Sequence, residues 1–337
     1  MSNNNEIPKD VLKFIQDSIS KIPVIVIGSG ASAAYGIAGM GQLANYLTKE
    51  IIATEDEKEL WEKFKQYLNN GLDLETALHK VDISKRLEKE VVLKTKELIL
   101  PKDIEIREKL VLGEVDMPLS LLITHLSETA NPQIKIVTTN YDRLVEYAVD
   151  YAGFNYYSGF LGKYIQRFDG KFNKEKVLNK IEILKVHGSL DWYTTSINEI
   201  LALPDSFQNT ENLFPVMVTP GKNKYQHTHD DPFRTLITRV DTVFLEAKSL
   251  LIIGFGFNDD HIQPKLMQKM RNSQTPIIII SKELTPKARE FIKTNENSKI
   301  LGIEECGEGS NLVFPNRDDL EINLSIWELK EFIKTFT

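Results

Sequence analysis

The sequence predicts an α/β fold built on a doubly wound, mainly parallel sheet, with a helical insert. Three observations support this prediction: short β-branched runs that are apolar on both faces, helical stretches between many of them, and one long Glu-, Lys- and Leu-rich stretch. Runs that are apolar on both faces are typical of strands buried in a parallel sheet. Their alternation with helices is typical of a doubly wound sheet.

Six runs are predicted to be strands, and each is followed by Gly, Thr, His or Ser. They are Pro23–Ile27, Ile134–Thr138, Ile181–Val186, Pro215–Val218, Leu250–Ile253 and Pro276–Ile280. Helices are predicted at Gln42–Ile52, Leu144–Ala152 and Phe233–Ala247, with an amphipathic helix around Ile326–Phe336. The polar stretches 162–180 and 194–212 are interpreted as loops or hairpins.

Residues 43–130 form the predicted insert. Within it, Trp61, Phe64, Tyr67 and Leu68 repeat at three- and four-residue spacing, which indicates amphipathic helices. We expect this insert to be a small cap over the carboxyl edge of the sheet. Its alternating charges are interpreted as a solvated face, with an oligomer contact as the alternative. A helical segment is predicted over 1–21, and the core over 22–42 and 131–337.

Composition excludes several classes of protein. With 41 basic and 48 acidic residues the formal charge is −7, which argues against nucleic-acid binding by the whole surface but leaves a local basic patch open. Cys306 is the only cysteine, so neither an intrachain disulfide nor a zinc site with paired cysteines can form. The first twenty residues are polar, and the apolar runs are too short to span a bilayer. We therefore expect a cytoplasmic protein without a membrane partner.

The first predicted strand runs into a glycine-rich turn, Gly28-Ser29-Gly30-Ala31-Ser32-Ala33, which matches G-x-G-x-x-A. Glycines let a backbone approach a pyrophosphate closely, and the N–H groups of the following helix point at it. The alternative is a tight turn that needs small residues. The usual ribose-binding acid about 20 residues on would be Glu50, but Glu50 lies in a helical stretch, which weakens the case for hydride transfer.

Three further strand ends carry polar loops. They read Thr138-Thr139-Asn140-Tyr141-Asp142, His187-Gly188-Ser189 and Gly254-Phe255-Gly256-Phe257-Asn258-Asp259-Asp260. Ligands of open α/β sheets bind outside the carboxyl ends of the strands, so these loops should converge near the glycine turn. Tyr35, Phe255 and Phe257 are expected either to line that cleft or to belong to the core. Asp259 or Asp260 is a candidate cap for a helix beginning near His261.

In this order, GSGAS, TTNYD, HG and GFGFND look like the NAD-binding signatures of the sirtuin (silent information regulator) family, over residues 22–285. The residues of these motifs look most like those of the bacterial sirtuin-like NAD hydrolases of antiphage defence systems. The resemblance implies a Rossmann-like NAD-binding core and a role for each matching residue. Asn140 and His187 match the catalytic residues, Ser32 and Asp142 lie near the nicotinamide pocket, Gly28, Ser29, Gly30 and Ala31 form the phosphate turn, and Gly254, Gly256 and Asn258 form the adenosine-side loop.

These residue types suit cleavage of the nicotinamide–ribose bond. Nicotinamide in NAD is a cationic leaving group, so positioning and electrostatics can supply most of the catalysis without a metal. An amide such as Asn140 can orient ribose hydroxyls and water, and a histidine can take a proton near neutral pH. The alternatives are that Asn140 or Asp142 caps a helix and that His187 is structural. His227 and His229 resemble a metal-ligand pair, but a polar turn is favoured and no metal is expected.

Two departures from the family pattern favour hydrolysis over protein deacylation. Deacylating sirtuins usually carry a zinc module with four cysteines, which Cys306 alone cannot form, and the loop Gly36-Ile37-Ala38-Gly39-Met40 lacks the family's arginine. The predicted activity is NAD glycohydrolysis to nicotinamide and ADP-ribose, which would deplete NAD in antiphage defence by abortive infection. Alternatives are a deacylase or ADP-ribosyltransferase, or a non-enzymatic sensor of NAD or ADP-ribose. The resemblance implies a homo-oligomer and a partner such as a HerA-type ATPase or another sensor protein; the trigger, the stoichiometry and the formation of cyclic ADP-ribose stay open.

Overall fold

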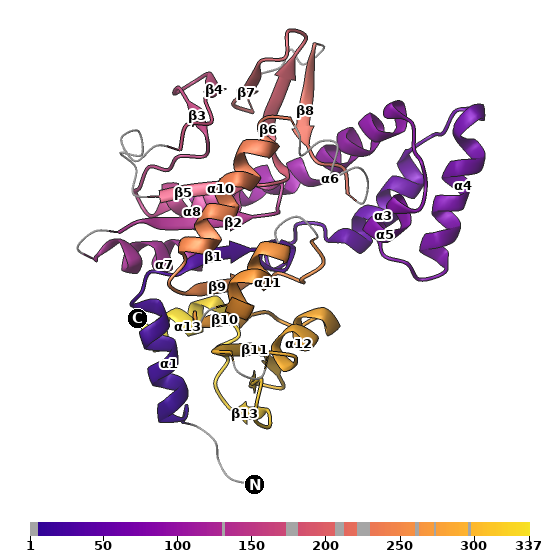
Figure 1. Ribbon diagram of the computed structural model, residues 1–337. Helices are drawn as coiled ribbons and strands as arrows, with labels where there is room; N and C mark the ends of the chain where they lie inside the picture. Colours follow the sequence, from indigo (N-terminus) through magenta and orange to yellow (C-terminus); the bar gives the residue numbers. More distant parts are fainter. Residues whose placement is uncertain are drawn as a thin grey trace.

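The computed structural model describes residues 6–129, 132–172, 181–205, 212–220, 230–259, 263–272, 274–295 and 298–337. Its main sheet has eight strands in the order β13-β12-β11-β10-β9-β1-β2-β5 (Figure 1). They are β1 Val24–Ile27, β2 Ile134–Thr138, β5 Ile181–Lys185, β9 Leu250–Ile253, β10 Ile277–Ile280, β11 Ile300–Cys306, β12 Gly309–Val313 and β13 Leu320–Ile322. All neighbours from β11 to β5 pair in parallel, and β12 and β13 extend the sheet antiparallel. The predicted α/β class with a mainly parallel, Rossmann-like sheet is confirmed.

The strand order places a topological switch point between β1 and β9. From β1 the chain moves outward to β2 and β5, then returns to β9 on the other side of β1 and continues to β10 and β11. At such a point the loops after the two strands diverge and leave a crevice at the carboxyl edge. The glycine turn after β1 and the Gly254 loop after β9 therefore border one crevice.

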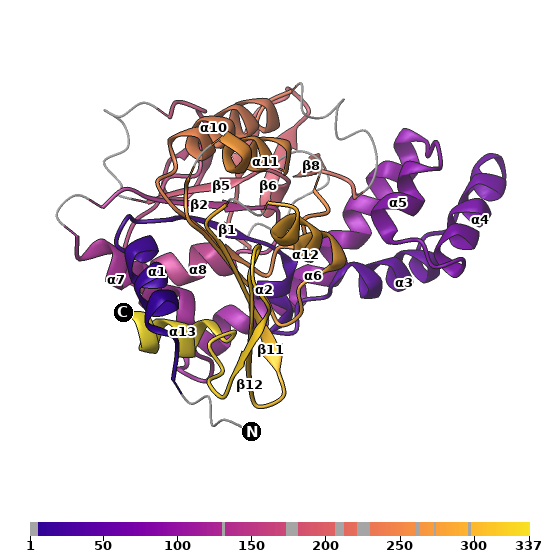
Figure 2. The same ribbon diagram turned by 60° about the horizontal axis from the view of Figure 1, so that its bottom comes forward.

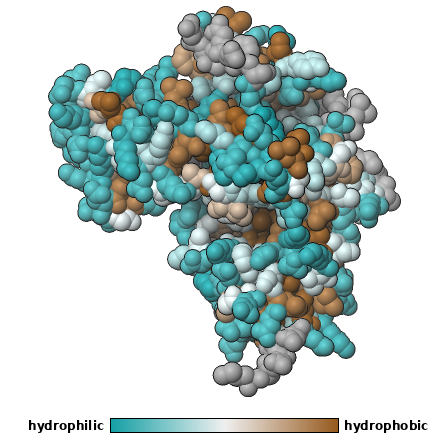
Figure 3. Space-filling model, turned by 180° about the vertical axis from the view of Figure 1, so that it is seen from behind, coloured by the Kyte–Doolittle hydropathy of each residue, from teal (hydrophilic) through white to brown (hydrophobic). Residues whose placement is uncertain are grey.

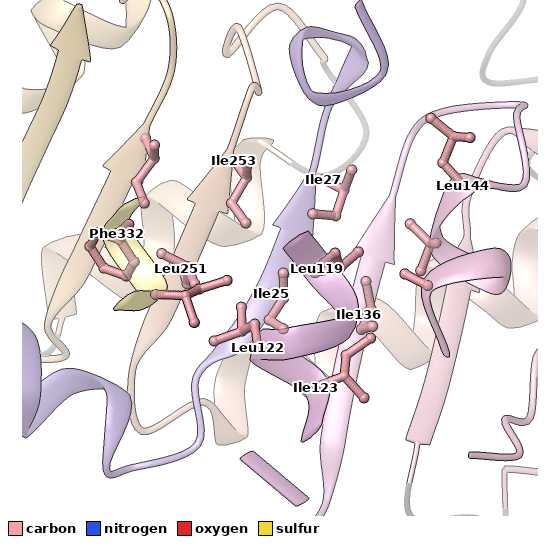
Figure 4. Packing of buried hydrophobic residues seen from close by; sticks show 14 of the residues in the cluster. Ile25, Ile27, Leu119, Leu122, Ile123, Ile136, Leu144, Leu251, Ile253 and Phe332 are labelled. Carbon is pink, nitrogen blue, oxygen red and sulfur yellow. The ribbon is translucent and has the colours of Figure 1, made fainter. Parts of the chain in front are cut away.

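Helices cover both faces of the sheet, as Figure 2 shows. They are α1 Lys9–Ile19, α2 Ser29–Ala33, α3 Met40–Glu50, α4 Glu55–Asn69, α5 Leu74–His79, α6 Lys85–Val111, α7 Pro118–Ser127, α8 Leu144–Tyr151, α10 Phe233–Glu246, α11 Gln263–Asn272, α12 Pro286–Lys293 and α13 Leu329–Phe336. Because successive strand residues point to opposite faces, Ile25 packs with α7 and α8 while Val26 packs with α10 and α12. Figure 4 shows Ile25, Ile136 and Leu251 against Leu122 of α7.

Helices α3 to α6 build the expected helical insert, which has an apolar cluster of its own. Trp61 and Phe64 of α4 are almost completely buried in it, with ring centroids 4.6 Å apart. Thr54 and Glu57 form a capping box at the start of α4, and Asp73 and Ser84 cap α5 and α6. Figures 1 and 2 show α3, α4 and α5 projecting to one side of the sheet. Helix α7 belongs instead to the sheet's own core cluster, and the division of the chain into domains stays a prediction.

One predicted strand belongs to a different sheet. The run Pro215–Val218, expected in the parallel sheet, is part of β8 (Leu213–Met217) and pairs antiparallel with β6 (Gly188–Thr195). The prediction was wrong because a parallel partner needs a long crossover, usually a helix, and none was predicted between Val186 and Pro215. The small sheet has the order β3-β4-β7-β6-β8, with β3 Phe160–Leu161, β4 Gln166–Phe168 and β7 Ile200–Ala202.

The surface is mostly hydrophilic on the face drawn in Figure 3, and apolar residues are exposed there in separate patches. The most exposed apolar side chains of the described residues are Ile52, Val111, Tyr164 and Ile197, on four different elements or turns. In the described part of the chain, no helix combines the length and apolar character that a bilayer crossing requires.

Candidate functional site

A cleft of about 1000 Å³, measured out to the open solvent at its mouth, lies at the carboxyl edge of β1, β2, β5 and β9. It contains residues from all four loops that the sequence singled out, together with residues of the insert. The lining residues are Ser29, Ser32, Ile37, Ala38, Met40, Leu43, Asp73, Glu75, Ile99, Thr139, Asn140, Tyr141, Asp142, His187, Phe255, Gly256, Asn258 and Asp259. The predicted convergence of the strand-end loops on one cleft is therefore confirmed, while the roles of the individual residues stay predictions.

The glycine turn packs directly against the loop after β9. The amide of Gly30 donates to the carbonyl oxygen of Gly254 at 2.9 Å, and that of Gly28 donates to Ile253 at 3.0 Å. A Cβ on Gly28 would lie 2.5 Å from the Gly254 oxygen, and one on Gly254, whose φ is +60°, would lie 2.2 Å from the Ala31 nitrogen. These glycines are thus required by backbone-to-backbone packing at the switch point, whatever ligand the turn approaches.

Asn140 is 7% exposed and its side chain is fixed by two hydrogen bonds. Its Nδ2 donates to the Gly28 carbonyl oxygen at 3.0 Å and to Ser32 Oγ at 2.9 Å, while its backbone N–H donates to Thr138 Oγ1 at 3.1 Å. A carbonyl oxygen can only accept, so the amide nitrogen must face Gly28. Both N–H groups of the amide therefore serve protein atoms, and its oxygen is the atom that a ligand in the cleft can use.

Ser32 links Asn140 to Asp142. Its oxygen accepts the bond from Asn140, and its hydroxyl is hydrogen-bonded to the Asp142 carboxyl group. Burial raises the pKa of Asp142, and the charge of Lys185 and the Ser32 bond oppose this shift. The three predicted residues thus form one buried polar chain on the cleft wall.

Lys185 lies next to this hydrogen-bonded set of Asn140, Ser32 and Asp142, and its side chain is completely buried. Its Nζ donates to the Asp142 carbonyl oxygen and lies 2.9 Å from Glu146 Oε1. Burial raises the pKa of Glu146 to about 6, although Lys185 lowers it. The loop after β2 is therefore supported from below by a buried ion pair.

His187 reaches the cleft from the turn between β5 and β6. Its Nε2 lies 2.9 Å from Asp259 Oδ2, and both side chains are more than nine-tenths buried. Its backbone oxygen accepts the Val218 amide at 2.9 Å, which ties the turn to β8. Gly188 follows at φ +87°, where a Cβ would lie 2.0 Å from the Val216 oxygen, so the His-Gly pair also has a packing reason.

The structure adds three acidic residues to the site that the sequence did not assign to it. Asp73 and Glu75 come from the start of α5, and Asp259 from the loop after β9. Asp259 was visible in the sequence only as a possible helix cap, because a cap and a ligand-binding carboxylate have the same residue type, and Asp73 and Glu75 were not singled out. With Asp142 they place four carboxyl groups around the cleft, and none of the described residues that line it is Lys or Arg.

The aromatic candidates divide between cleft and core. Phe255 lines the cleft, whereas Phe257 is completely buried, with its ring 4.3 Å from that of Phe291. Tyr35 packs against the core cluster, where burial and the charge of Asp116 raise its pKa to about 12. His227, His229, Asp260 and His261 lie outside the described residues. Within the described ranges, no group of three or more His, Cys, Asp or Glu side chains is placed to hold a metal ion.

Comparison with known proteins identifies the central part of the chain. Residues 134–301 match the family model of the SIR2-like domain. This part of the chain is similar to a SIR2-like domain. The match covers Asn140, His187 and the Gly254 loop, and it begins after the glycine turn. The sirtuin resemblance is thus confirmed at the level of the domain, and its antiphage, HerA-associated branch stays a prediction.

Similar solved structures include several sirtuins. One, from a study of sirtuin substrate affinity, is 13% identical, with 97% of this chain and 98% of that chain covered and a TM-score of 0.48. Sir2Tm bound to a propionylated peptide is 13% identical, with 96% of each chain covered and a TM-score of 0.47. A Sir2 complex with a p53 peptide and NAD⁺ is also 13% identical, covers 98% and 96%, and has a TM-score of 0.47. No curated protein matches the sequence.

Proposed function

We propose that this chain is an NAD glycohydrolase that cleaves the nicotinamide–ribose bond and releases nicotinamide and ADP-ribose. One observation carries the proposal: Asn140 and His187, from the ends of β2 and β5, line a single cleft with the glycine turn and the β9 loop, and both lie in the part of the chain that is similar to a SIR2-like domain. NAD as the ligand is part of this proposal and follows from the resemblance of the strand-end motifs to the NAD-binding signatures of sirtuins.

The cleft suits a reaction that develops positive charge on ribose. Departure of the cationic nicotinamide leaves an oxocarbenium-like centre, which is stabilised by carboxylates placed in advance around it. Four carboxyl groups, among them Asp142 and Asp259, line this cleft. Negative potential at the ribose stabilises the positive charge as it moves from the nicotinamide ring to the ribose carbon.

Asn140 and His187 would have different roles toward water, which is the acceptor of the ribosyl group in this proposal. The Asn140 oxygen can accept a hydrogen bond from a ribose hydroxyl or from the attacking water, because both amide N–H groups are held by Gly28 and Ser32. His187 can accept the proton that the water or hydroxyl loses, and the adjacent Asp259 stabilises the resulting imidazolium. The bond between the ribose carbon and the nicotinamide nitrogen breaks, and its electron pair leaves with neutral nicotinamide. The water oxygen bonds to the ribose carbon, one of its protons passes to His187, and the other stays on the new hydroxyl group.

Water is favoured over an acyl-lysine as the acceptor because the chain has one cysteine and lacks the arginine in the Gly36–Met40 loop. We also propose that NAD depletion serves antiphage defence by abortive infection in the cytoplasm, in a homo-oligomer assembled with a HerA-type ATPase or another sensor. The competing proposals are a protein deacylase or ADP-ribosyltransferase and a non-enzymatic NAD or ADP-ribose sensor.

Chromatography of NAD incubations tests the activity. Wild type should release nicotinamide without an acyl-peptide, and Asn140→Ala and His187→Ala should each reduce release by about 100-fold or more. Matched controls are Asn45→Ala and His79→Ala, which change exposed residues of α3 and α5 and should retain wild-type turnover. Equal turnover in the wild type and in both site variants would overturn the assignment.

A silent wild type would be retested after coexpression with the proteins encoded beside it, because a trigger can be required. If NAD still binds without turnover, the sensor proposal replaces the hydrolase. If nicotinamide appears only in proportion to an added acyl-peptide, the deacylase proposal does.

A further inference from the structure

Helix α6 connects the insert to the core. Its first turns bury Leu87 and Val91 in the insert's apolar cluster, whereas Ile99, Ile106 and Leu110 pack in the cluster beneath the sheet. Ile99 also lines the cleft. One continuous helix of 27 residues therefore touches the insert, the cleft and the core.

Four residues after Ile99, the same helix carries Asp103, a completely buried carboxylate. Its Oδ1 accepts the backbone N–H of Arg143 at 2.7 Å. Its Oδ2 accepts Arg143 Nε at 3.0 Å, Arg143 Nη2 at 2.5 Å and the Tyr147 hydroxyl at 2.6 Å. Charge-assisted, multidentate bonds of this kind fix geometry more strictly than neutral bonds do.

A second carboxylate completes the arrangement. Asp205, at the end of the described segment after β7, lies 2.6 Å from Arg143 Nη1, and Arg107 of α6 lies 2.5 Å from its other oxygen. Arg143 is 6% exposed, so its positive charge is stabilised by the carboxylates of Asp103 and Asp205 rather than by water. The guanidinium thus joins α6 to the segment after β7 at one point.

Arg143 directly follows the loop that holds Asn140 and Asp142. At the other end of this loop, the backbone N–H of Asn140 is held by Thr138 of β2. The loop is therefore held at its start by Thr138 of the sheet and at its end by its anchor on α6, the bond from the Arg143 amide to Asp103, while Lys185 bonds the Asp142 carbonyl oxygen between these two points.

We propose that Asp103 and Arg143 are positioning residues through which α6 of the insert sets the geometry of Asn140 and Asp142. The proposal deepens the NAD hydrolase assignment and rests on it for its functional consequence. Any displacement of α6 would therefore move the catalytic loop through the bond between Asp103 and the Arg143 amide. Because misplacing reacting groups by about 1 Å can reduce turnover about 100-fold, small shifts of α6 suffice for control.

The test uses the full chain with Asp103→Asn, the double variant Asp103→Leu with Arg143→Met, and Glu105→Gln as control. Glu105 lies on the same helix, and among the described residues its ion pairs are with the half-buried Lys102 and the exposed Lys109, so its change leaves the anchor intact. The double variant replaces both members of the buried pair by apolar side chains. It leaves no unpaired buried charge, so it should fold even if Asp103→Asn does not.

Hydrogen exchange of a peptide spanning residues 139–147 reports the anchor without reference to activity. Asp103→Asn and the double variant should each raise the exchange rate of this peptide about tenfold or more, and Glu105→Gln should leave it unchanged. Nicotinamide release should fall in kcat by about 100-fold in the first two variants, with a smaller change in KM.

Unchanged exchange in both the single and the double variant would overturn the proposal, as would raised exchange with wild-type kcat. If wild type releases no nicotinamide under any condition, the exchange result still decides whether the anchor exists, and the hydrolase assignment fails separately.

Discussion

Replacing Gly254 by alanine should destabilise the fold, although the same change at Gly256, two residues on, should not. Both glycines belong to the loop after β9, and in the sequence they serve the same motif. In the structure, Gly254 has φ +60° and a Cβ there would lie 2.2 Å from the Ala31 nitrogen. A Cβ on Gly256 would lie 3.3 Å from Asn258 Nδ2 and 3.4 Å from Thr285 Cγ2.

The magnitude follows from two costs and one gain. Holding an alanine in the left-handed region costs roughly 1–2 kcal/mol. Moving the glycine turn away from the new methyl group adds roughly 1–3 kcal/mol, as overpacking does elsewhere. Alanine also reduces the conformational entropy of the unfolded chain, which stabilises the folded state by about 0.4–1 kcal/mol. Gly254→Ala should therefore lower the free energy of unfolding by about 1–5 kcal/mol, and Gly256→Ala should change it by less than about 1 kcal/mol.

Urea unfolding of both variants, with unchanged m, gives this comparison directly. Gly254→Ala should also weaken NAD binding, because the displaced turn carries Gly28, whose carbonyl oxygen holds Asn140. Equal unfolding free energies for Gly254→Ala and wild type would refute the packing argument. Equal losses at Gly254 and Gly256 would show that the motif requires glycine for a reason other than this contact.

Three further substitutions probe the site and its support. Asp259→Asn should lower kcat for nicotinamide release about tenfold or more with a smaller change in KM, because it removes the carboxylate 2.9 Å from His187 Nε2; a wild-type kcat contradicts this. Tyr141→Phe should lower the free energy of unfolding by about 0.5–1.5 kcal/mol, because its hydroxyl donates to the Val218 carbonyl at 2.6 Å; urea unfolding measures it. Burial raises the pKa of Glu146 from 4.5 to about 6, so the folded state favours its protonated form. The protonated carboxyl group therefore contributes to the stability of the folded state, fully below about pH 4.5, and this contribution is lost as pH rises through about 6. Glu146→Gln should reduce the difference between the free energies of unfolding at pH 4.5 and pH 7 by up to about 2 kcal/mol, which urea unfolding at the two pH values measures.

The parallel strands could be predicted because burial on both faces leaves a continuous apolar run. Ile277–Ile280 is such a run, and its strand is found with almost the same bounds. Strands β11 to β13 were not predicted, although they extend the same sheet. Glu304 and Glu305 interrupt the apolar pattern of β11, and the pairing of Glu304 with Arg289 and Asn311 becomes visible only in the folded chain.

For the site, the sequence indicated which loops converge but not which contacts they make. The positions of Asn140 and His187 follow from two facts, that both end parallel strands and that such ends share an edge. Asp73 and Glu75 could not be assigned, because the packing of α5 against the cleft depends on tertiary contacts of the insert. The same limit applies to the glycines, since their partner is a backbone more than 220 residues away in sequence, as the pair Gly30 and Gly254 shows.

The acidic lining constrains how NAD could lie in the cleft. A pyrophosphate carries two negative charges, and the described residues that line the cleft offer it no lysine or arginine. The amides of Gly28, Gly30 and Ala31 already donate to carbonyl oxygens of the protein, so the donor that the glycine turn can offer the phosphates is the hydroxyl of Ser29, which lines one side of the cleft. The carboxyl groups of Asp73, Glu75, Asp142 and Asp259 would repel the phosphates and attract the nicotinamide cation. NAD should therefore bind with its nicotinamide ribose toward these acids, which is the orientation that brings the scissile bond to Asn140 and His187.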